Sequence, residues 1–121
     1  MIRVAVTGTD TGVGKTVTAC MLVAALRARG LAVGAMKPVE TGIIARDGTT
    51  DAERLRRAAG DADDLATVCP FTLSEPLAPW VAAERAGGAI DPVMTYRQSG
   101  YRRRKAEERP STKGAAVSGI V

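Results

Sequence analysis

Short apolar runs alternate with glycine-rich and polar segments at the start of the chain. Residues 2–6 are rich in β-branched side chains and end just before Gly8, which indicates a buried strand. Residues 15–29 are rich in Ala, Leu and Val, and Gly30 follows where a helix C-terminus is expected. Residues 31–36 form a second strand-like run. Strand, helix and strand in this order predict a βαβ unit, and therefore a parallel sheet with a right-handed crossover.

Two further helices are indicated in the middle of the chain. The run Thr-Asp-Ala-Glu that begins at Thr50 fits a capping box, so a helix is predicted over residues 51–59, with Gly60 as its end. Prolines interrupt the following stretch, and residues 80–86 predict a short helix before a pair of glycines. The chain up to residue 94 is therefore expected to be one partial α/β domain.

The pattern changes after residue 94. Residues 95–121 contain no Leu, Met or Phe and only three aliphatic β-branched residues. Residues 102–105 form a block of like charge. Because such a composition buries too little apolar surface to offset the entropy of ordering, we expect a basic, disordered tail.

Charge and cysteine content narrow the class of protein. The net charge is +4, but residues 1–94 carry 10 basic and 11 acidic side chains, whereas residues 95–121 carry 7 and 2. The basic character belongs to the tail. The tail has only two aromatic residues, Tyr96 and Tyr101, that could stack on bases, so nucleic acid is not an expected partner.

Neither a disulfide framework nor a CxxC metal site is indicated by Cys20 and Cys69. No apolar run is long enough for a membrane span, and a cytoplasmic protein is expected.

The strongest chemical motif occupies residues 8–16, between the first predicted strand and the first predicted helix. Its sequence is Gly-Thr-Asp-Thr-Gly-Val-Gly-Lys-Thr. In this context backbone N–H groups and the helix N-terminus bind phosphate, and the lysine adds a positive charge. The residues expected to bind the phosphates of ATP are Gly12, Val13, Gly14, Lys15 and Thr16, and the hydroxyl of the last can also ligate Mg²⁺. The alternative is a glycine-rich turn that only joins strand to helix.

The first glycine distinguishes this loop within its class. The common motif has Gly six residues before the lysine, where this chain has Thr9, and the glycine comes one residue earlier. Partition and division-site ATPases carry a second lysine within the loop, at the position of Asp10. This difference argues against those ATPases.

Two charged residues follow the second predicted strand. Lys37 lies at its C-terminal end, the edge at which ligands bind in open α/β sheets, and could neutralise a phosphoryl group in transfer. A solvated lysine at a strand end is the alternative. Asp51 could be a Mg²⁺ ligand, or simply a residue at the helix start.

Four segments resemble, in order and spacing, the N-terminal half of the dethiobiotin synthetase family. They are the loop at residues 8–16, Lys-Pro-Val-Glu-Thr-Gly at residues 37–42, Asp51, and Pro-Phe-Thr-Leu-Ser-Glu-Pro-Leu-Ala-Pro at residues 70–79. The resemblance extends over residues 1 to about 92 and implies a P-loop NTPase-like α/β fold, with a parallel sheet and flanking helices, that is incomplete in this chain.

The resemblance also implies a reaction and its residues. In biotin biosynthesis, this family of ligases forms the ureido ring of dethiobiotin from 7,8-diaminononanoate, CO₂ and ATP, through a carbamate that ATP phosphorylates. By position, Lys15 and Lys37 would be catalytic, Thr16 and Asp51 would hold Mg²⁺, and Thr11 and Thr41 would contact the substrate. A cytoplasmic homodimer with small-molecule substrates is implied.

The resemblance leaves one part of the family pattern unmatched. The family continues with a strand that ends in Glu-Gly-Ala-Gly-Gly, whose Glu is a Mg²⁺ ligand, and this sequence has no carboxylate after Glu108. The Arg-, Ser- and Gly-rich composition from Thr95 onward is typical of a frameshifted or truncated product. Two hypotheses follow: a dethiobiotin synthetase, or a non-catalytic remnant that retains only a phosphate-binding loop.

Overall fold

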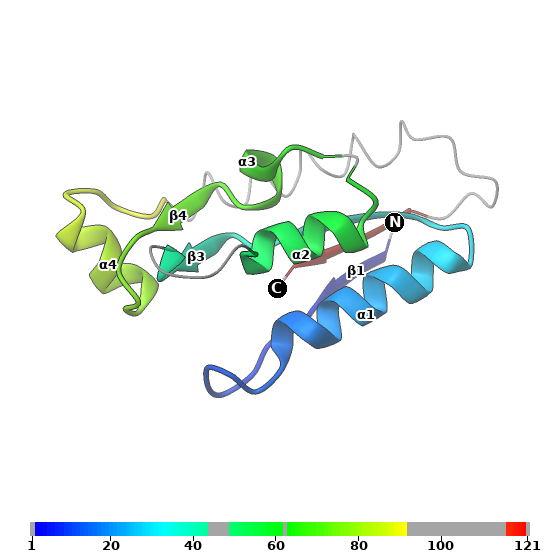
Figure 1. Cartoon of the computed structure of the whole chain (residues 1–121), viewed down its shortest axis with the longest axis horizontal. Helices are drawn as coiled ribbons and strands as arrows, with labels where there is room; N and C mark the ends of the chain where they lie inside the picture. Colours follow the sequence, from blue (N-terminus) through cyan, green and yellow to red (C-terminus); the bar gives the residue numbers. More distant parts are fainter. Residues whose placement is uncertain (1, 44–48, 62, 92–115, 121) are drawn as a thin grey trace.

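The core of the fold is a parallel sheet of three strands. The computed structural model describes residues 2–43, 49–61, 63–91 and 116–120. Strands β1 (Ile2–Ala5), β5 (Ala116–Ile120) and β2 (Ala32–Met36) are neighbours in that order, and both pairs are parallel (Figure 1). The P-loop type of α/β fold, with a partial parallel sheet and flanking helices, is thus confirmed.

The strand β5 lies where the sequence analysis expected no regular structure. It pairs with β1 on one side and β2 on the other, in register with Ile2 and Val33 at Val117. A central parallel strand forms backbone hydrogen bonds on both sides. This pairing can order a segment that contains few apolar side chains. The structure differs here from the predicted disordered tail over these five residues. The rest of residues 95–121 lies outside the described residues, and the division of the chain at residue 94 stays a prediction.

Two helices cover the same face of this sheet. Helix α1 (Lys15–Ala28) follows β1, and α2 (Asp51–Ala58) runs beside it (Figure 1). Their limits agree with the predicted helices, and Gly30 has a φ of 79° just after α1. At the far ends of the two helices, the Arg27 guanidinium donates to the carbonyl of Ala58 at 3.1 Å. The two helices are therefore joined at their C-terminal ends as well as along their length.

A second, smaller parallel sheet lies beyond β2. It consists of β3 (Val39–Thr41) and β4 (Phe71–Leu73), which the sequence analysis did not predict. The short helix α3 (Leu65–Val68) precedes β4, and α4 (Pro79–Arg85) packs against both strands, where the short helix over residues 80–86 was predicted. No helix within the described residues is long and apolar enough to cross a membrane.

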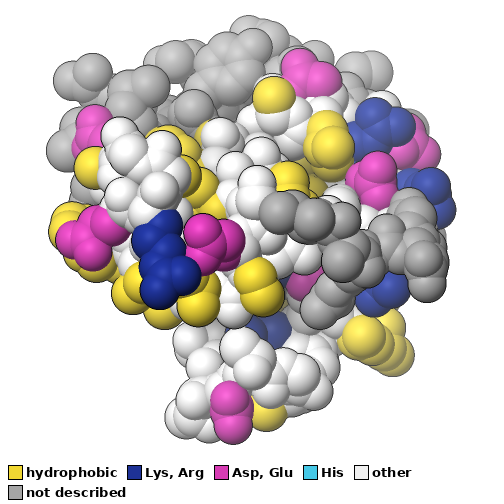
Figure 2. Space-filling view, turned by 60° about the vertical axis from the view of Figure 1, so that its left-hand side comes forward, with side chains coloured by type: hydrophobic (Ala, Val, Ile, Leu, Met, Phe, Trp, Pro, Cys, Tyr) yellow, Lys and Arg dark blue, Asp and Glu magenta, His cyan; other side chains and the backbone are white. Residues whose placement is uncertain are grey.

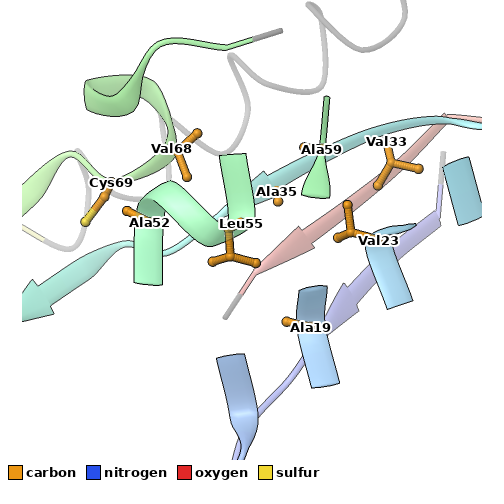
Figure 3. Packing of buried hydrophobic residues seen from close by; sticks show 9 residues of the cluster. All are labelled: Ala19, Val23, Val33, Ala35, Ala52, Leu55, Ala59, Val68 and Cys69. Carbon is orange, nitrogen blue, oxygen red and sulfur yellow. The ribbon is translucent and has the colours of Figure 1, made fainter. Parts of the chain in front are cut away.

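Small aliphatic side chains make up the core between the helices and the sheet (Figure 3). Leu55 of α2 is completely buried and lies between α1 and β2, facing Ala19 and Val23 of α1. The remaining members of the cluster come from β2, α2 and the α3 region; they are Val33, Ala35, Ala52, Ala59, Val68 and Cys69. Because these side chains are small, the helices approach the sheet closely, and this brings the starts of α1 and α2 together.

The surface at the α4 end mixes both signs of charge. Figure 2 shows Lys and Arg side chains beside Asp and Glu side chains there, among exposed hydrophobic side chains. One such pair is Arg85 and Glu75, whose charged atoms are 3.0 Å apart. Neighbouring opposite charges partly cancel among the side chains that the structure describes on this face.

Candidate functional site

The phosphate-binding motif forms the loop between β1 and α1. Gly12 and Gly14 have φ values of 73° and 93°, in the left-handed region that favours glycine. A Cβ atom added at either position would meet no atom within 4 Å. The glycines are therefore required by the backbone conformation, and the space in front of the loop is open.

The N-terminus of α1 is left without partners of its own. Gly14 is its N-cap and provides no side-chain hydrogen bond, and the first turn carries no acidic residue. Among the described residues, no hydrogen bond is made by the backbone N–H groups of residues 12–16. These free donors and the positive end of the helix dipole favour an anion at this position.

Lys15 lies inside its own loop. Its ammonium group donates to the backbone carbonyl of Asp10, and its aliphatic stem passes close to Gly8. The Asp10 carboxylate in turn accepts from the N–H of Thr11 at 2.7 Å. Within the described residues this carbonyl is the partner of the ammonium group, and a neutral carbonyl leaves its charge uncompensated for an incoming phosphate.

Three residues from separate elements converge on one carboxylate. Asp51, the first residue of α2, accepts a hydrogen bond at Oδ2 from the Thr16 hydroxyl at 2.8 Å. The same oxygen is 2.5 Å from Nζ of Lys37, which follows β2. The side chains of Lys37 and Asp51 are only 18% and 22% exposed. The structure thus brings together Thr16, Lys37 and Asp51, which the sequence analysis assigned to metal binding and catalysis.

Burial and hydrogen bonding act in opposite directions on the pKa of Asp51. Burial raises this pKa, but the hydrogen bonds from Lys37 and Thr16 and the charge on Lys37 outweigh it, and the pKa is lowered from its ordinary value. Asp51 is therefore a carboxylate at neutral pH. The carboxylate also affects Cys20, whose thiol pKa is raised by burial and then by the charge on Asp51.

Glu40 of β3 supports this cluster, and the sequence analysis gave it no role. It is 8% exposed, and its two carboxylate oxygens accept from the N–H groups of Asp51 and Ala52 at 2.7 and 3.1 Å. No local pattern marked this role, because β3 has only three residues and a glutamate there needs a partner only once the fold buries it. The identity of that partner, eleven residues later, depends on the tertiary fold.

Two predicted substrate residues lie outside the cluster. Thr11 is exposed in the loop, and Thr41 ends β3, where it pairs with Leu73. No contact within the described residues joins either threonine to Asp51. Their assignment to substrate stays a prediction.

A family profile described as "AAA domain" matches residues 3–110 of this chain. Individual relatives are named ATP-dependent dethiobiotin synthetase. The one from Anaeromyxobacter dehalogenans (strain 2CP-C) is 54% identical over 85 residues, which is 70% of this chain and 38% of the relative. One from Anaeromyxobacter sp. (strain Fw109-5) is 50% identical over the same shares. One from Bacillus thuringiensis (strain Al Hakam) is 41% identical over 70% of this chain and 35% of its own length.

These matches agree with the local chemistry of the loop and the Asp51 cluster. They cover well under half the length of each named relative. The profile covers most of this chain and extends past residue 94. The chain therefore belongs to the family described as AAA domain and, within it, is similar to the N-terminal part of the ATP-dependent dethiobiotin synthetases.

Proposed function

We propose that this chain binds Mg-ATP at the start of α1 and serves the phosphoryl-transfer step of dethiobiotin formation. One observation carries the proposal: the Thr16 hydroxyl and the Lys37 ammonium meet on the Asp51 carboxylate, directly beside the open phosphate loop. Phosphoryl transfer needs positioned phosphates, positive charge and a metal ion. The loop and this cluster offer groups for each of these three needs.

The phosphate loop would hold the nucleotide. Free N–H groups on residues 12–16 and the dipole of α1 would bind phosphate oxygens. Lys15 would exchange its contact with the Asp10 carbonyl for the β- and γ-phosphates, because a phosphate is a much stronger partner for an ammonium group than a neutral carbonyl.

The donor atoms near the loop suit Mg²⁺. Thr16 Oγ1 and Asp51 Oδ2 are hard oxygen donors 2.8 Å apart, and Asp51 is ionised. Mg²⁺ commonly takes one or two protein ligands and completes its shell with phosphates and water. Thr16 and Asp51 would supply two such ligands, which fits a metal that arrives with the nucleotide. When bound, Mg²⁺ would neutralise charge on the phosphates.

Lys37 would stabilise charge at the reacting phosphoryl group. It lies at the carboxyl end of β2, and its Nζ belongs to the same cluster as Thr16 of the loop. A cation that is already held near the transferred group gains interaction energy as charge develops there. Lys37 is therefore expected to affect turnover more than nucleotide binding.

The proposed substrates are those that the resemblance to the dethiobiotin synthetase family implies. The carbamate of 7,8-diaminononanoate, formed with CO₂, would receive the phosphoryl group, and the second amine would close the ring with release of phosphate. Thr11 in the loop and Thr41 at the end of β3 would contact the diamine and the carbamate. The activity as a whole is proposed because the match covers 38% of such a relative.

A homodimer in the cytoplasm is part of the same proposal. Val17 and Met21 lie four residues apart on α1, Val13 precedes them by four residues in the loop before the helix, and the three are 58%, 68% and 57% exposed, respectively. Exposed apolar side chains in such a row support a contact with another subunit. Both cysteines of the chain are free, as in a reducing compartment. Molar mass measured by light scattering across a concentration series would test the dimer.

Calorimetric titration tests the central proposal. The chain is titrated with ATP in the presence of Mg²⁺ and in its absence, and binding is expected to be tighter with the metal. The variant Asp51→Asn keeps the size of the side chain but loses a charged ligand, so its binding should no longer depend on Mg²⁺. Equal affinity of the parent chain with and without Mg²⁺ would reject the metal site, and no binding at all would reject the function.

A further inference from the structure

One short segment of the chain, residues 37–40, contacts both the side chain and the backbone of Asp51. Lys37, at the start of the segment, contacts the Asp51 side chain, and Glu40, three residues later, binds the backbone N–H of the same residue at 2.7 Å. Between them lies Pro38, whose ring fixes one backbone dihedral. The position of the Asp51 carboxylate therefore depends on the segment that also supplies Lys37.

The contact made by Glu40 is more than is needed to cap α2. A complete capping box is already present, in which the Thr50 hydroxyl accepts from Glu53 N at 3.2 Å and the Glu53 carboxylate accepts from Thr50 N at 2.9 Å. Glu40 comes from a separate strand and binds the two N–H groups between these, those of Asp51 and Ala52. All three N–H groups of the first turn are thus bonded, and Glu40 fixes the turn to β3.

The Glu40 carboxylate is paired with the start of α2. It accepts hydrogen bonds from two N–H groups at the start of α2, the positive end of the helix dipole. Its charge still reaches Cys69, where burial and then the charge on Glu40 raise the thiol pKa to about 11. Lys37 is left to pair with Asp51.

From this geometry we infer that Glu40 is a positioning residue for the metal-binding carboxylate. Through the backbone of Asp51 and Ala52 it sets where the Asp51 side chain meets Thr16 and Lys37, and touches neither metal nor nucleotide itself. Residues that orient a metal ligand typically change metal affinity about 10–100-fold when they are replaced. The inference rests on the proposed Mg-ATP site and adds a specific residue to it.

Two variants of the full chain separate positioning from mere stability. Glu40→Gln keeps one acceptor oxygen, loses the second and the charge, and leaves the phosphate loop untouched. Thr50→Ala, the matched control, removes the capping box of the same helix but leaves both Glu40 contacts in place. For each variant, ADP binding is measured by calorimetry without metal and over a Mg²⁺ series, and the melting temperature is recorded.

Glu40→Gln is expected to raise the Mg²⁺ concentration for half-maximal enhancement of ADP binding roughly ten-fold or more. Metal-free ADP binding should stay within about two-fold of the parent, because Glu40 does not touch the loop of α1. Thr50→Ala should melt at a lower temperature and change neither binding constant by more than about two-fold. If Glu40→Gln instead behaves like Thr50→Ala, Glu40 supports the helix only and the inference is overturned.

The remaining outcomes are also decisive. If Glu40→Gln does not melt cooperatively, Glu40→Asp is measured in the same way. This variant keeps the charge and shortens the side chain by one methylene group. An unchanged Mg²⁺ midpoint in Glu40→Asp overturns the positioning role. Absence of any Mg²⁺ effect on ADP binding by the parent chain rejects the proposed metal site, and with it the role of Glu40. A Mg²⁺ effect in the parent with an unshifted midpoint in the variant rejects the role of Glu40 alone.

Discussion

The two helices that cover the sheet begin in opposite ways. Helix α1 starts at a glycine, has no acidic residue in its first turn and no side-chain cap. Helix α2 starts at Thr50 with a full capping box, two acidic residues in its first turn, and the Glu40 carboxylate bound to its N–H groups. The same unsatisfied donors exist at the start of every helix. In α2 the chain satisfies them itself, whereas in α1 the described residues provide no partner for them.

The difference separates a binding element from its support. An open helix start can bind an anion but lacks the stability that a cap adds, whereas a capped start is more stable and has no free N–H groups for an anion. Asp51 belongs to both, because its backbone lies in the closed start of α2 and its side chain reaches Thr16 on the open start of α1. Substitutions of loop residues on the open side should therefore change ligand binding, and loss of the Thr50 cap on the closed side should change stability, whereas Asp51 and Glu40 connect the two sides.

The largest effect is expected at Lys37, which pairs with Asp51 at the start of α2. In a chimaera in which residues 1–91 replace the matched segment of the Anaeromyxobacter dehalogenans relative, Lys37→Ala should lower turnover roughly 10²-fold or more, as the loss of a charge contact to the transition state does. Dethiobiotin formation from the diamine, bicarbonate and ATP is the measurement.

The matched control for this prediction is Arg85→Ala. It removes an exposed cation at the end of α4, whose charge is paired with Glu75. It should leave turnover within about two-fold, because exposed ion pairs contribute little. A Lys37→Ala turnover close to that of the parent chimaera would remove Lys37 from the chemistry and leave it as a structural partner of Asp51.

The second largest effect is expected at Lys15, on the open side. Lys15→Ala should weaken binding of ATP or ADP at least about ten-fold, because a charge-assisted hydrogen bond to phosphate is lost and the helix dipole supplies only part of the charge. Calorimetry on the 121-residue chain measures this. Arg29→Ala, at the other end of α1, removes the same charge far from the loop and should bind as the parent does. Equal affinities of the two variants would contradict the assignment of Lys15.

The local parts of the fold could be predicted from the sequence because their signals are local. The capping box at Thr50 and the glycine after α1 are decided within one helical turn, and the structure has both. The strands β3 and β4 could not be predicted, since three-residue strands show no clear period and their pairing is long-range. For the same reason β5 was missed: its order depends on two partner strands more than 80 positions away.

In the candidate site, too, local motifs could be predicted from the sequence and long-range contacts could not. The motif around Lys15 and the lysine after the second strand identified the open helix start, because phosphate binding imposes a spacing on neighbouring residues. That Thr16 and Asp51, 35 positions apart, share a hydrogen bond follows only from the packing of α1 against α2. Glu40 escaped notice because its partners are backbone N–H groups, which leave no pattern in the sequence.

A smaller effect is expected on the closed side. Thr50→Ala removes the side-chain acceptor of the capping box, and should lower the free energy of unfolding by about 1 kcal/mol. Urea denaturation followed by circular dichroism gives this value. Thr50→Ser keeps the acceptor and is the control, and its stability should stay close to that of the parent. A fall in nucleotide affinity in Thr50→Ala, at a temperature where the variant is fully folded, would break the division between binding and support.

The smallest effect is the share of acid stability that Asp51 contributes. Its pKa is raised by burial but lowered more by Lys37 and Thr16, so the folded chain holds the ionised form better than the unfolded chain, where the pKa is about 3.9. This contribution is fully present above that unfolded value and is lost as the pH falls through the lower folded value. Urea denaturation between pH 6 and about pH 3 should therefore show a steeper loss of stability for the parent than for Asp51→Asn, which has no titrating group there. All other carboxylates are common to both proteins, so the difference between the two curves isolates Asp51. Parallel curves would mean that Lys37 and Thr16 do not favour the ionised form of Asp51 in solution, and the link between the two helix starts would then be weaker than their geometry indicates.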